Sequence, residues 1–224
     1  MHLSDPAKGH LGSSAVVASC LPVAVGAAFA NKVLENERLC AVFFGDGALD
    51  AGVFWESLNA ASLYKVPLLF VFEDNELAVH TSASARQATR DIADVARQMS
   101  VDVFESNSTD VEEVADLFTA AAGVRATGSP AFLRLKCYRY LEHVGTKPDF
   151  EAGYRSREEY ERWFARDCVI TQRSRLLEAG IPENDVKAVE IQVDRQIEEG
   201  LQAARLAPFP PLSELYRGVF HEAD

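Results

Sequence analysis

Asp46 and Asn75 are the polar side chains whose types and positions best suit metal-assisted chemistry. Each follows an apolar run, 39–44 and 67–72, that is too short for a helix and is typical of a strand buried on both faces. If these strands are parallel, their carboxyl ends meet at one edge of a sheet, where open α/β folds bind ligands. A carboxylate and an amide oxygen suit Mg²⁺, and a backbone carbonyl in the loop after Asn75 could supply a third ligand.

The residues around Asp46 add groups suited to a phosphate. Gly45 and Gly47 tolerate positive φ and let backbone N–H groups approach a ligand closely. The helix predicted to begin near Asp50 would point its positive end at an anion. Asp46 would repel a bare phosphate, but a cation between them removes that conflict. The pattern therefore predicts a site for magnesium diphosphate.

Each of these signals also has an ordinary structural explanation. Gly45-Asp46-Gly47 could be a plain turn after a strand, and Asn75 could be a cap. His143 is either a surface histidine in a loop or a second phosphate donor. The case for a site rests on the positions of Asp46 and Asn75 at the ends of two apolar strands.

Strands and helices alternate through the first part of the chain. Strands are expected at 39–44, 67–72, 101–104 and 130–137, and helices at about 19–35, 50–64, 92–99 and 110–125. Ser19 is the expected N-cap of the first helix. This alternation predicts an α/β fold in which helices flank a parallel sheet with right-handed crossovers.

The second part of the chain has a different character. Segment 138–154 is polar and has no consistent period, so it is predicted to be a long loop. Ser156 and Glu159 then form a capping box, and a long charged helix follows near 183–206. We therefore expect an α/β domain over 1–155 and a helical C-terminal extension of the same domain over 156–224.

Composition excludes several classes of function. Asp and Glu number 34 against 22 Lys and Arg, a net charge of −12 without a basic run, so no nucleic-acid partner is expected. No apolar stretch approaches the roughly 20 residues of a membrane helix, and the start resembles no signal peptide. The cysteines are far apart and form no C-x-x-C pair: Cys20, Cys40, Cys137 and Cys168. We expect a cytoplasmic protein with reduced thiols and no membrane contact.

Several stretches together resemble the α subunits of thiamine diphosphate-dependent 2-oxoacid dehydrogenases, the E1 components that act on pyruvate, acetoin or branched-chain oxo acids. They are MHL at the start, LPVAVGAAFA, FFGDGALDAGVFWESLNAASLYKVPLLFVFEDNELAVHTS, YRYLEHVG and GYRSREEYERW. The resemblance covers nearly the whole chain. It implies a thiamine diphosphate-binding fold over residues 1–155.

The resemblance also implies roles for particular residues. Mg²⁺ would be held by the Asp46 carboxylate, the Asn75 side chain and the carbonyl of Leu77. Gly47 and Ala48 would offer backbone amides to the diphosphate, and Val17 would contact the aminopyrimidine ring through its backbone. His143 matches a loop histidine that reaches the diphosphate and the active site, so it is the candidate catalytic residue.

The resemblance implies an oxidoreductase subunit that acts with a β-type E1 subunit, in an α2β2 heterotetramer. The reaction would be decarboxylation of a 2-oxo acid and transfer of the acyl group to lipoamide on an acyltransferase, or to another carbonyl. The family's glutamate that activates the aminopyrimidine belongs to the β subunit. The sequence also lacks the family's N-terminal segment, with its diphosphate-binding arginine, before the MHL stretch. Leu77 stands where the family mostly has Tyr or Trp, and Ala15 or Ala24 where it mostly has Gly.

Three other interpretations fit parts of the sequence. GHLG at the start and GDGALDAGVFWES suit the N-terminal half of a split transketolase. The spacing from Gly45 to Asp50 suits a phosphatase of the haloacid dehalogenase type, but no apolar strand ending in D-x-D precedes it. The third alternative is a noncatalytic assembly subunit with the same fold.

Overall fold

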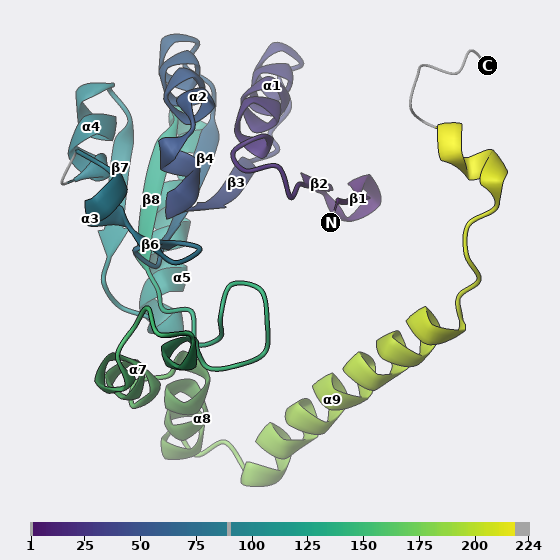
Figure 1. Cartoon of the computed structure of the whole chain (residues 1–224). Coiled ribbons are helices and arrows are strands. Elements are labelled where there is room, and N and C mark those ends of the chain that lie inside the picture. Colours follow the sequence, from purple (N-terminus) through teal and green to yellow (C-terminus); the bar gives the residue numbers. More distant parts are fainter. Residues whose placement is uncertain (1, 89–90, 218–224) are drawn as a thin grey trace. The chain divides into compact units, whose positions relative to one another are not determined.

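Four parallel strands form the central sheet, in the order β3-β4-β8-β7 (Figure 1). Their bounds are β3 Cys40–Gly45, β4 Leu68–Asp74, β7 Asp102–Ser106 and β8 Ala131–Lys136. Gly45 pairs with Glu73 and Asp74 pairs with Lys136, so β3, β4 and β8 end at the same edge. The predicted parallel sheet is confirmed.

The structure, a computed structural model, describes residues 2–88 and 91–217. The chain forms two compact units, Met1–Gln172 and Arg173–Asp224. The predicted boundary between the α/β domain (1–155) and its helical extension (156–224) stays a prediction.

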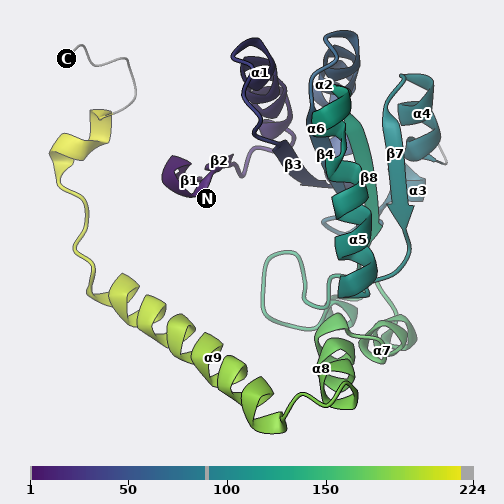
Figure 2. The same cartoon turned by 180° about the vertical axis from the view of Figure 1, so that it is seen from behind.

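Helices cover both faces of the sheet. One face carries α1 (Cys20–Val33), α2 (Gly52–Leu63) and α4 (Ile92–Gln98), and the view from behind shows α5 (Val111–Ala122) and α6 (Val124–Thr127) on the other (Figure 2). Asp110 caps α5 by accepting hydrogen bonds from the backbone N–H groups of Glu112 and Glu113. Ser19 precedes α1 as predicted, but its side chain makes no capping hydrogen bond because its backbone is already helical.

Alternate side chains of the strands fill two hydrophobic clusters. Phe44, Phe72 and Phe132 point to the face of α1, α2 and α4, with the rings of Phe44 and Phe72 stacked 5.7 Å apart. Leu69, Val71 and Leu133 point to the face of α5 and α6. β4 is buried on both faces, as its continuous apolar run predicts. The same prediction is wrong for β3, where Ala41 and Phe43 are exposed, because β3 is an edge strand and only one of its faces is covered.

The connection after β3 differs from the prediction. A 3-10 helix, η2 (Asp46–Asp50), follows the strand directly, and α2 begins only at Gly52. Gly45 is therefore the last residue of β3, and Asp46 and Gly47 are the first residues of the 3-10 helix. Other short elements are β1 (Leu3–Asp5), η1 (Pro6–Lys8), β2 (His10–Ser13), β5 (Leu77–Ala78), β6 (Thr81–Ser82) and α3 (Ala83–Arg86).

Segment 138–154 is irregular, as predicted, but its ends are packed. Tyr138 stacks on Trp163 with ring centroids 5.5 Å apart, and Phe150 meets Tyr160 edge to face at 4.9 Å. The segment ends in a 3-10 helix, η3 (Asp149–Ala152). Its aromatic residues are too irregularly spaced to show a period, yet they give it a small core with α7.

The helical C-terminal part consists of α7 (Arg157–Phe164), α8 (Cys168–Glu178), α9 (Glu183–Leu206) and the 3-10 helix η4 (Leu212–Tyr216). Ser156 caps α7 by accepting a hydrogen bond from the Glu159 backbone N–H at 3.1 Å, the main half of the predicted capping box. Along α9, apolar side chains such as Val193 and Ile197 are exposed. Within residues 2–88 and 91–217, no helix is long and apolar enough to cross a membrane.

Candidate functional site

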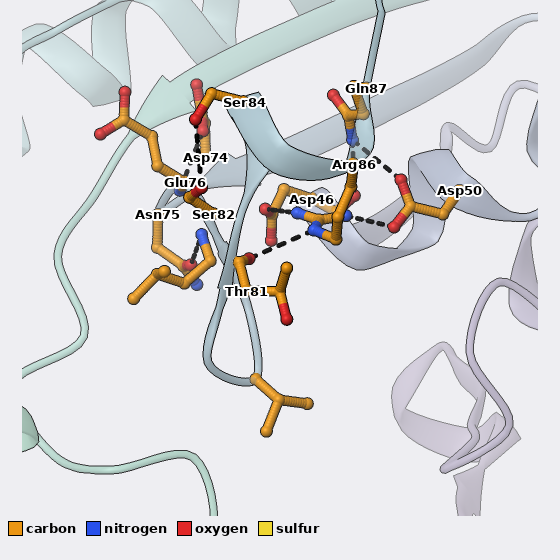
Figure 3. A network of polar contacts seen from close by, with 12 residues as sticks. Asp46, Asp50, Asp74, Asn75, Glu76, Thr81, Ser82, Ser84, Arg86 and Gln87 are labelled. Carbon is orange, nitrogen blue, oxygen red and sulfur yellow. Dashed lines mark hydrogen bonds and ion pairs between the residues drawn. The ribbon is translucent and has the colours of Figure 1, made fainter. Parts of the chain in front are cut away.

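The carboxyl ends of β3 and β4 bring Asp46 and Asn75 to one edge of the sheet. The two strands run parallel with Gly45 opposite Glu73, so the residues that follow them emerge side by side. Asp46 is only 2% exposed, whereas Asn75 is half-buried. Figure 3 shows both side chains in one close view, with Asp46 joined to Arg86 and Asn75 bonded to the Leu77 backbone. The structure therefore brings together the two side chains predicted to hold a metal ion.

Asp46 has a positively charged partner that the sequence did not suggest. The Arg86 guanidinium, at the end of α3, makes ion pairs with both Asp46 and Asp50 (Figure 3). Its Nε also donates to the carbonyl of Thr81 at 3.2 Å. Burial raises the pKa of the Asp46 carboxyl, while the charge of Arg86 and its hydrogen bond oppose that rise.

A tight hairpin holds Asn75 against the loop after β3. The Asn75 Oδ1 accepts a hydrogen bond from the Leu77 backbone N–H at 2.9 Å, and β5 pairs with β6 in antiparallel fashion. A Cβ atom on residue 47 would lie 3.2 Å from the Cβ of Ala78. Glycine at position 47 thus allows the hairpin and η2, which contains Ala48, to approach each other closely.

A buried network of charged residues holds the backbone carbonyl of Asn75. Arg155 donates to the Asn75 carbonyl and lies 3.4 Å from the carboxylate of Asp149, which is 0% exposed. The Tyr138 hydroxyl donates to Asp149 at 2.8 Å, and the Arg155 guanidinium lies over the Tyr138 ring, 4.3 Å from its centroid. This network joins both ends of segment 138–154 to a predicted metal ligand.

His143 lies at the exposed tip of the same segment. Its Nδ1 is 3.3 Å from Nη1 of Arg139, and Arg139 Nη2 donates to the Val79 carbonyl at 2.8 Å and to the Tyr154 hydroxyl at 3.1 Å. Arg139 therefore connects His143 to the hairpin that follows Asn75. The side chain of Val17, just before α1, is 65% exposed, and its contact with a cofactor stays a prediction.

A cleft of about 390 Å³ opens beside Asp46, and its lining includes Asp74, Gln87 and Arg134. Arg134 holds the Asp74 carboxylate through Nε at 2.9 Å and Nη2 at 2.7 Å. Asp74 is therefore neutralised by its own partner. Of the predicted metal ligands only Asp46 lines this cleft; Asn75 and Leu77 are not among its lining residues.

The residues present fit a magnesium-held diphosphate. Asp46 and Asn75 offer the oxygen ligands that Mg²⁺ prefers, and an amide oxygen that already accepts one hydrogen bond retains a second lone pair. A side chain at position 47 would crowd Ala78, so glycine there favours the close approach of the two loops. Arg86 now supplies the positive charge at the Asp46 carboxylate that a bound cation would supply in its place.

Four functional candidates were missed from the sequence: Arg86, Arg139, Asp149 and Arg155. Arg86 stands in a segment of small and polar residues that predicts no element. Asp149 and Arg155 look like ordinary charged residues of a loop, although Arg155 lies in one of the family-like stretches. Within the part of the chain that the structure describes, the strands before β3 form only the antiparallel β1–β2 hairpin. The phosphatase interpretation thus lacks the preceding parallel strand for its nucleophile.

Comparisons with known proteins identify the family. The model for the dehydrogenase E1 component family matches residues 1–213. The pyruvate dehydrogenase E1 component subunit alpha of Rickettsia bellii is 32% identical over 98% of this chain and 67% of its own length. The protein of the same name from Zymomonas mobilis is 31% identical over 98% of this chain and 62% of its own length. This chain therefore belongs to the dehydrogenase E1 component family of thiamine diphosphate-dependent enzymes.

Proposed function

We propose that the chain is the α-type subunit of a two-component enzyme that binds magnesium thiamine diphosphate and decarboxylates a 2-oxo acid. The product acyl group would pass to an acceptor, either a lipoyl group on an acyltransferase or a carbonyl compound. The placement of Asp46 and Asn75 at adjacent strand ends, in a chain of this family, supports the proposal most strongly. The family match also favours a dehydrogenase component over half of a transketolase.

Each candidate residue has a defined task in this proposal. Asp46, Asn75 and the Leu77 carbonyl would hold Mg²⁺, which carries the diphosphate. The backbone N–H groups of Gly47 and Ala48 would donate to the diphosphate oxygens, where the absence of a side chain at Gly47 permits close approach. Thiamine diphosphate itself supplies the nucleophilic carbon and the electron sink that decarboxylation requires.

His143 and the segment around it would act on the exposed side of the site. The imidazole would donate a hydrogen bond to a phosphate oxygen or to the reacting group, and Val17 would contact the aminopyrimidine through its backbone. Arg155, paired with Asp149, would keep Asn75 in position, because Arg155 donates a hydrogen bond to the Asn75 carbonyl. Closing of this segment over the ligand would exclude water from the reaction.

A β-type subunit completes the proposed enzyme. E1 α subunits of this family act together with a β subunit, and we propose an α2β2 heterotetramer for this chain. The exposed apolar side chains Val23, Phe29 and Val33 of α1 offer a surface that such a partner would cover. The assembled enzyme would deliver its product to a lipoyl-bearing acyltransferase.

Calorimetric titration of thiamine diphosphate into the magnesium-loaded complex of this chain with its β-type partner tests the proposal. Asp46→Asn should weaken binding by at least about 100-fold, since one metal ligand loses its charge. Asp94→Asn is the matched control, because Asp94 is an exposed carboxylate paired with Arg97 on α4. Equal affinity in the Asp46→Asn variant and the control would refute the proposal and favour a noncatalytic assembly subunit.

A further inference from the structure

Arg86 fills the place beside Asp46 where a metal ion would supply positive charge. Its side chain is 12% exposed, and its three nitrogens are all engaged, by Asp46, Asp50 and the Thr81 carbonyl (Figure 3). A guanidinium held on three sides by acceptors is a specific ion pair rather than a solvated surface charge. The contact ties α3 to the η2 turn after β3.

The pair meets an electrostatic need of the site before any cofactor binds. Asp46 is buried at the end of β3, near the carboxylate of Asp74, which itself raises the pKa of Asp46. An uncompensated buried carboxylate is costly, so the site needs a cation at all times. Arg86 provides that cation from within the chain.

Asp50 gives Arg86 a second anionic partner that is outside the proposed metal site. Asp50 is more exposed than Asp46, and Gln87 Nε2 donates to its Oδ1 at 3.2 Å. The guanidinium can therefore give up Asp46 while it keeps Asp50 and the Thr81 carbonyl. Because these two contacts remain, the free-energy cost of separating Arg86 from Asp46 is lowered.

We infer that Arg86 is an internal counter-ion that a divalent cation displaces from Asp46, and that Asp50 retains the displaced guanidinium. The inference rests on the proposed function, since it takes Asp46 as a metal ligand. Arg86 is thus a positioning residue: it keeps the Asp46 carboxylate in place for the metal and sets the affinity with which the metal enters. Arg86 and the cation compete for one carboxylate.

This competition predicts effects of opposite sign. Arg86→Gln should bind Mn²⁺ about 10-fold more tightly than the parent, because the competing charge is gone. Asp50→Asn should bind Mn²⁺ about fivefold more weakly, because Asp46 is then the one remaining carboxylate partner of Arg86 among those described here. In the double variant the Asp50→Asn effect should disappear, and its affinity should match that of Arg86→Gln within about twofold.

The double variant separates competition from a general field effect. If the charges of Arg86 and Asp50 acted only through their fields, the two changes would add, and the double variant would bind about fivefold more weakly than Arg86→Gln. Arg173→Gln is the matched control, since Arg173 on α8 pairs with Glu183 and Glu190 on α9, and these helices carry none of the proposed site residues. It should leave Mn²⁺ affinity unchanged.

The experiment is a titration of Mn²⁺ alone into the full chain assembled with its β-type partner, followed by the electron paramagnetic resonance signal of free Mn²⁺. A second measurement, the rise of Tm with Mn²⁺, should be larger for Arg86→Gln, whose metal-free form lacks the counter-ion. If Arg86→Gln fails to fold, Arg86→Lys serves instead, because lysine keeps the charge but cannot bridge both carboxylates; its affinity should exceed that of the parent.

The outcomes distinguish the two proposals. If Asp46→Asn binds Mn²⁺ as the parent does, Asp46 is no metal ligand and the proposed function fails. If Asp46→Asn loses binding but the Arg86 variants bind no more tightly than the parent, the proposed function stands and the counter-ion inference is overturned. Additive effects in the double variant overturn it as well.

Discussion

At the scale of single residues, the site depends on buried ion pairs, two of which join residues that are far apart in the sequence. Asp46 pairs with Arg86, Asp74 with Arg134, and Asp149 with Arg155. Each pair has at least one member that is nearly or fully buried, so removing one partner leaves an uncompensated charge. These pairs hold the loops around Asp46 and Asn75 in a fixed arrangement before a ligand binds.

His143→Ala should lower cofactor affinity or turnover by about ten- to a hundred-fold, because it removes a charge-assisted hydrogen bond to the diphosphate or the reacting group. Titration calorimetry and steady-state kinetics on the assembled enzyme measure the two effects. Lys147→Ala is the control, since Lys147 lies on the same exposed tip. If the two variants behave alike, His143 is an ordinary surface histidine.

Cys137, directly after β8, should make stability depend on pH in the alkaline range. Burial, together with the nearby carboxylates of Glu73 and Asp74, raises the pKa of its thiol from 9.0 to about 11. The folded chain then holds a proton that the unfolded chain has lost, so the free energy of unfolding falls as pH rises from 9 to 11.

Urea denaturation at several pH values measures this effect of Cys137. The alkaline decline should be shallower in Cys137→Ala, which has no thiol to titrate, than in the parent. Cys168→Ala, which removes an exposed thiol, should keep the parent's decline. Parallel declines in the parent and Cys137→Ala would show that the thiol does not titrate in a buried environment.

At the scale of elements, the parallel pairing of β3 with β4 creates the site. Neighbouring parallel strands end at the same edge, so the residues after Gly45 and Asp74 come together without any direct sequence signal between them. Aromatic side chains from three neighbouring strands pack together on one face of the sheet. Phe132, from the next strand, contacts Phe72 and Phe44 with centroids 5.9 and 6.2 Å away.

Phe132→Ala should lower the free energy of unfolding by about 3–5 kcal/mol, because it opens a cavity among fully buried rings. Urea denaturation followed by far-ultraviolet circular dichroism measures the change. Phe209→Ala is the control, because its side chain is 96% exposed; it should change stability by less than about 0.5 kcal/mol. A loss below about 1 kcal/mol for Phe132→Ala would mean that the core repacks around the gap.

At the scale of the whole molecule, the chain carries exposed apolar surface that a partner would cover. Apolar side chains of α1 are exposed in the first unit, and those of α9 in the second. Large exposed apolar patches in folded chains mark interaction surfaces. An E1 α subunit is expected to present such surfaces to its β-type partner.

The isolated chain should bind magnesium thiamine diphosphate at least about 10-fold more weakly than its complex with the β-type partner, because part of the proposed site belongs to that subunit. Titration calorimetry on the two preparations measures the difference. Tight stoichiometric binding by the isolated chain would contradict a site shared between subunits.

The sequence by itself determined the parallel sheet and the positions of Asp46 and Asn75 at strand ends. These features follow from local signals: each strand is a short continuous apolar run, and the polar residue that ends it is visible in the same few positions. That β3 leaves one face exposed was not predicted, because its place at the sheet edge is not visible in the run itself. The hairpin of β1 and β2 and the hairpin after Asn75 escaped prediction, because strands of two to four residues carry too little pattern.

Only the tertiary structure decided which charges meet. Arg86 reaches Asp46 across a hairpin and a short helix, and Arg155 reaches the Asn75 carbonyl from beyond segment 138–154. Such contacts depend on the path of the loops at the sheet edge, and the spacing of residues along the sequence does not predict them. The packing of Tyr138 and Phe150 on α7 was hidden for the same reason, since aromatic residues at irregular intervals form a core only once the chain has folded.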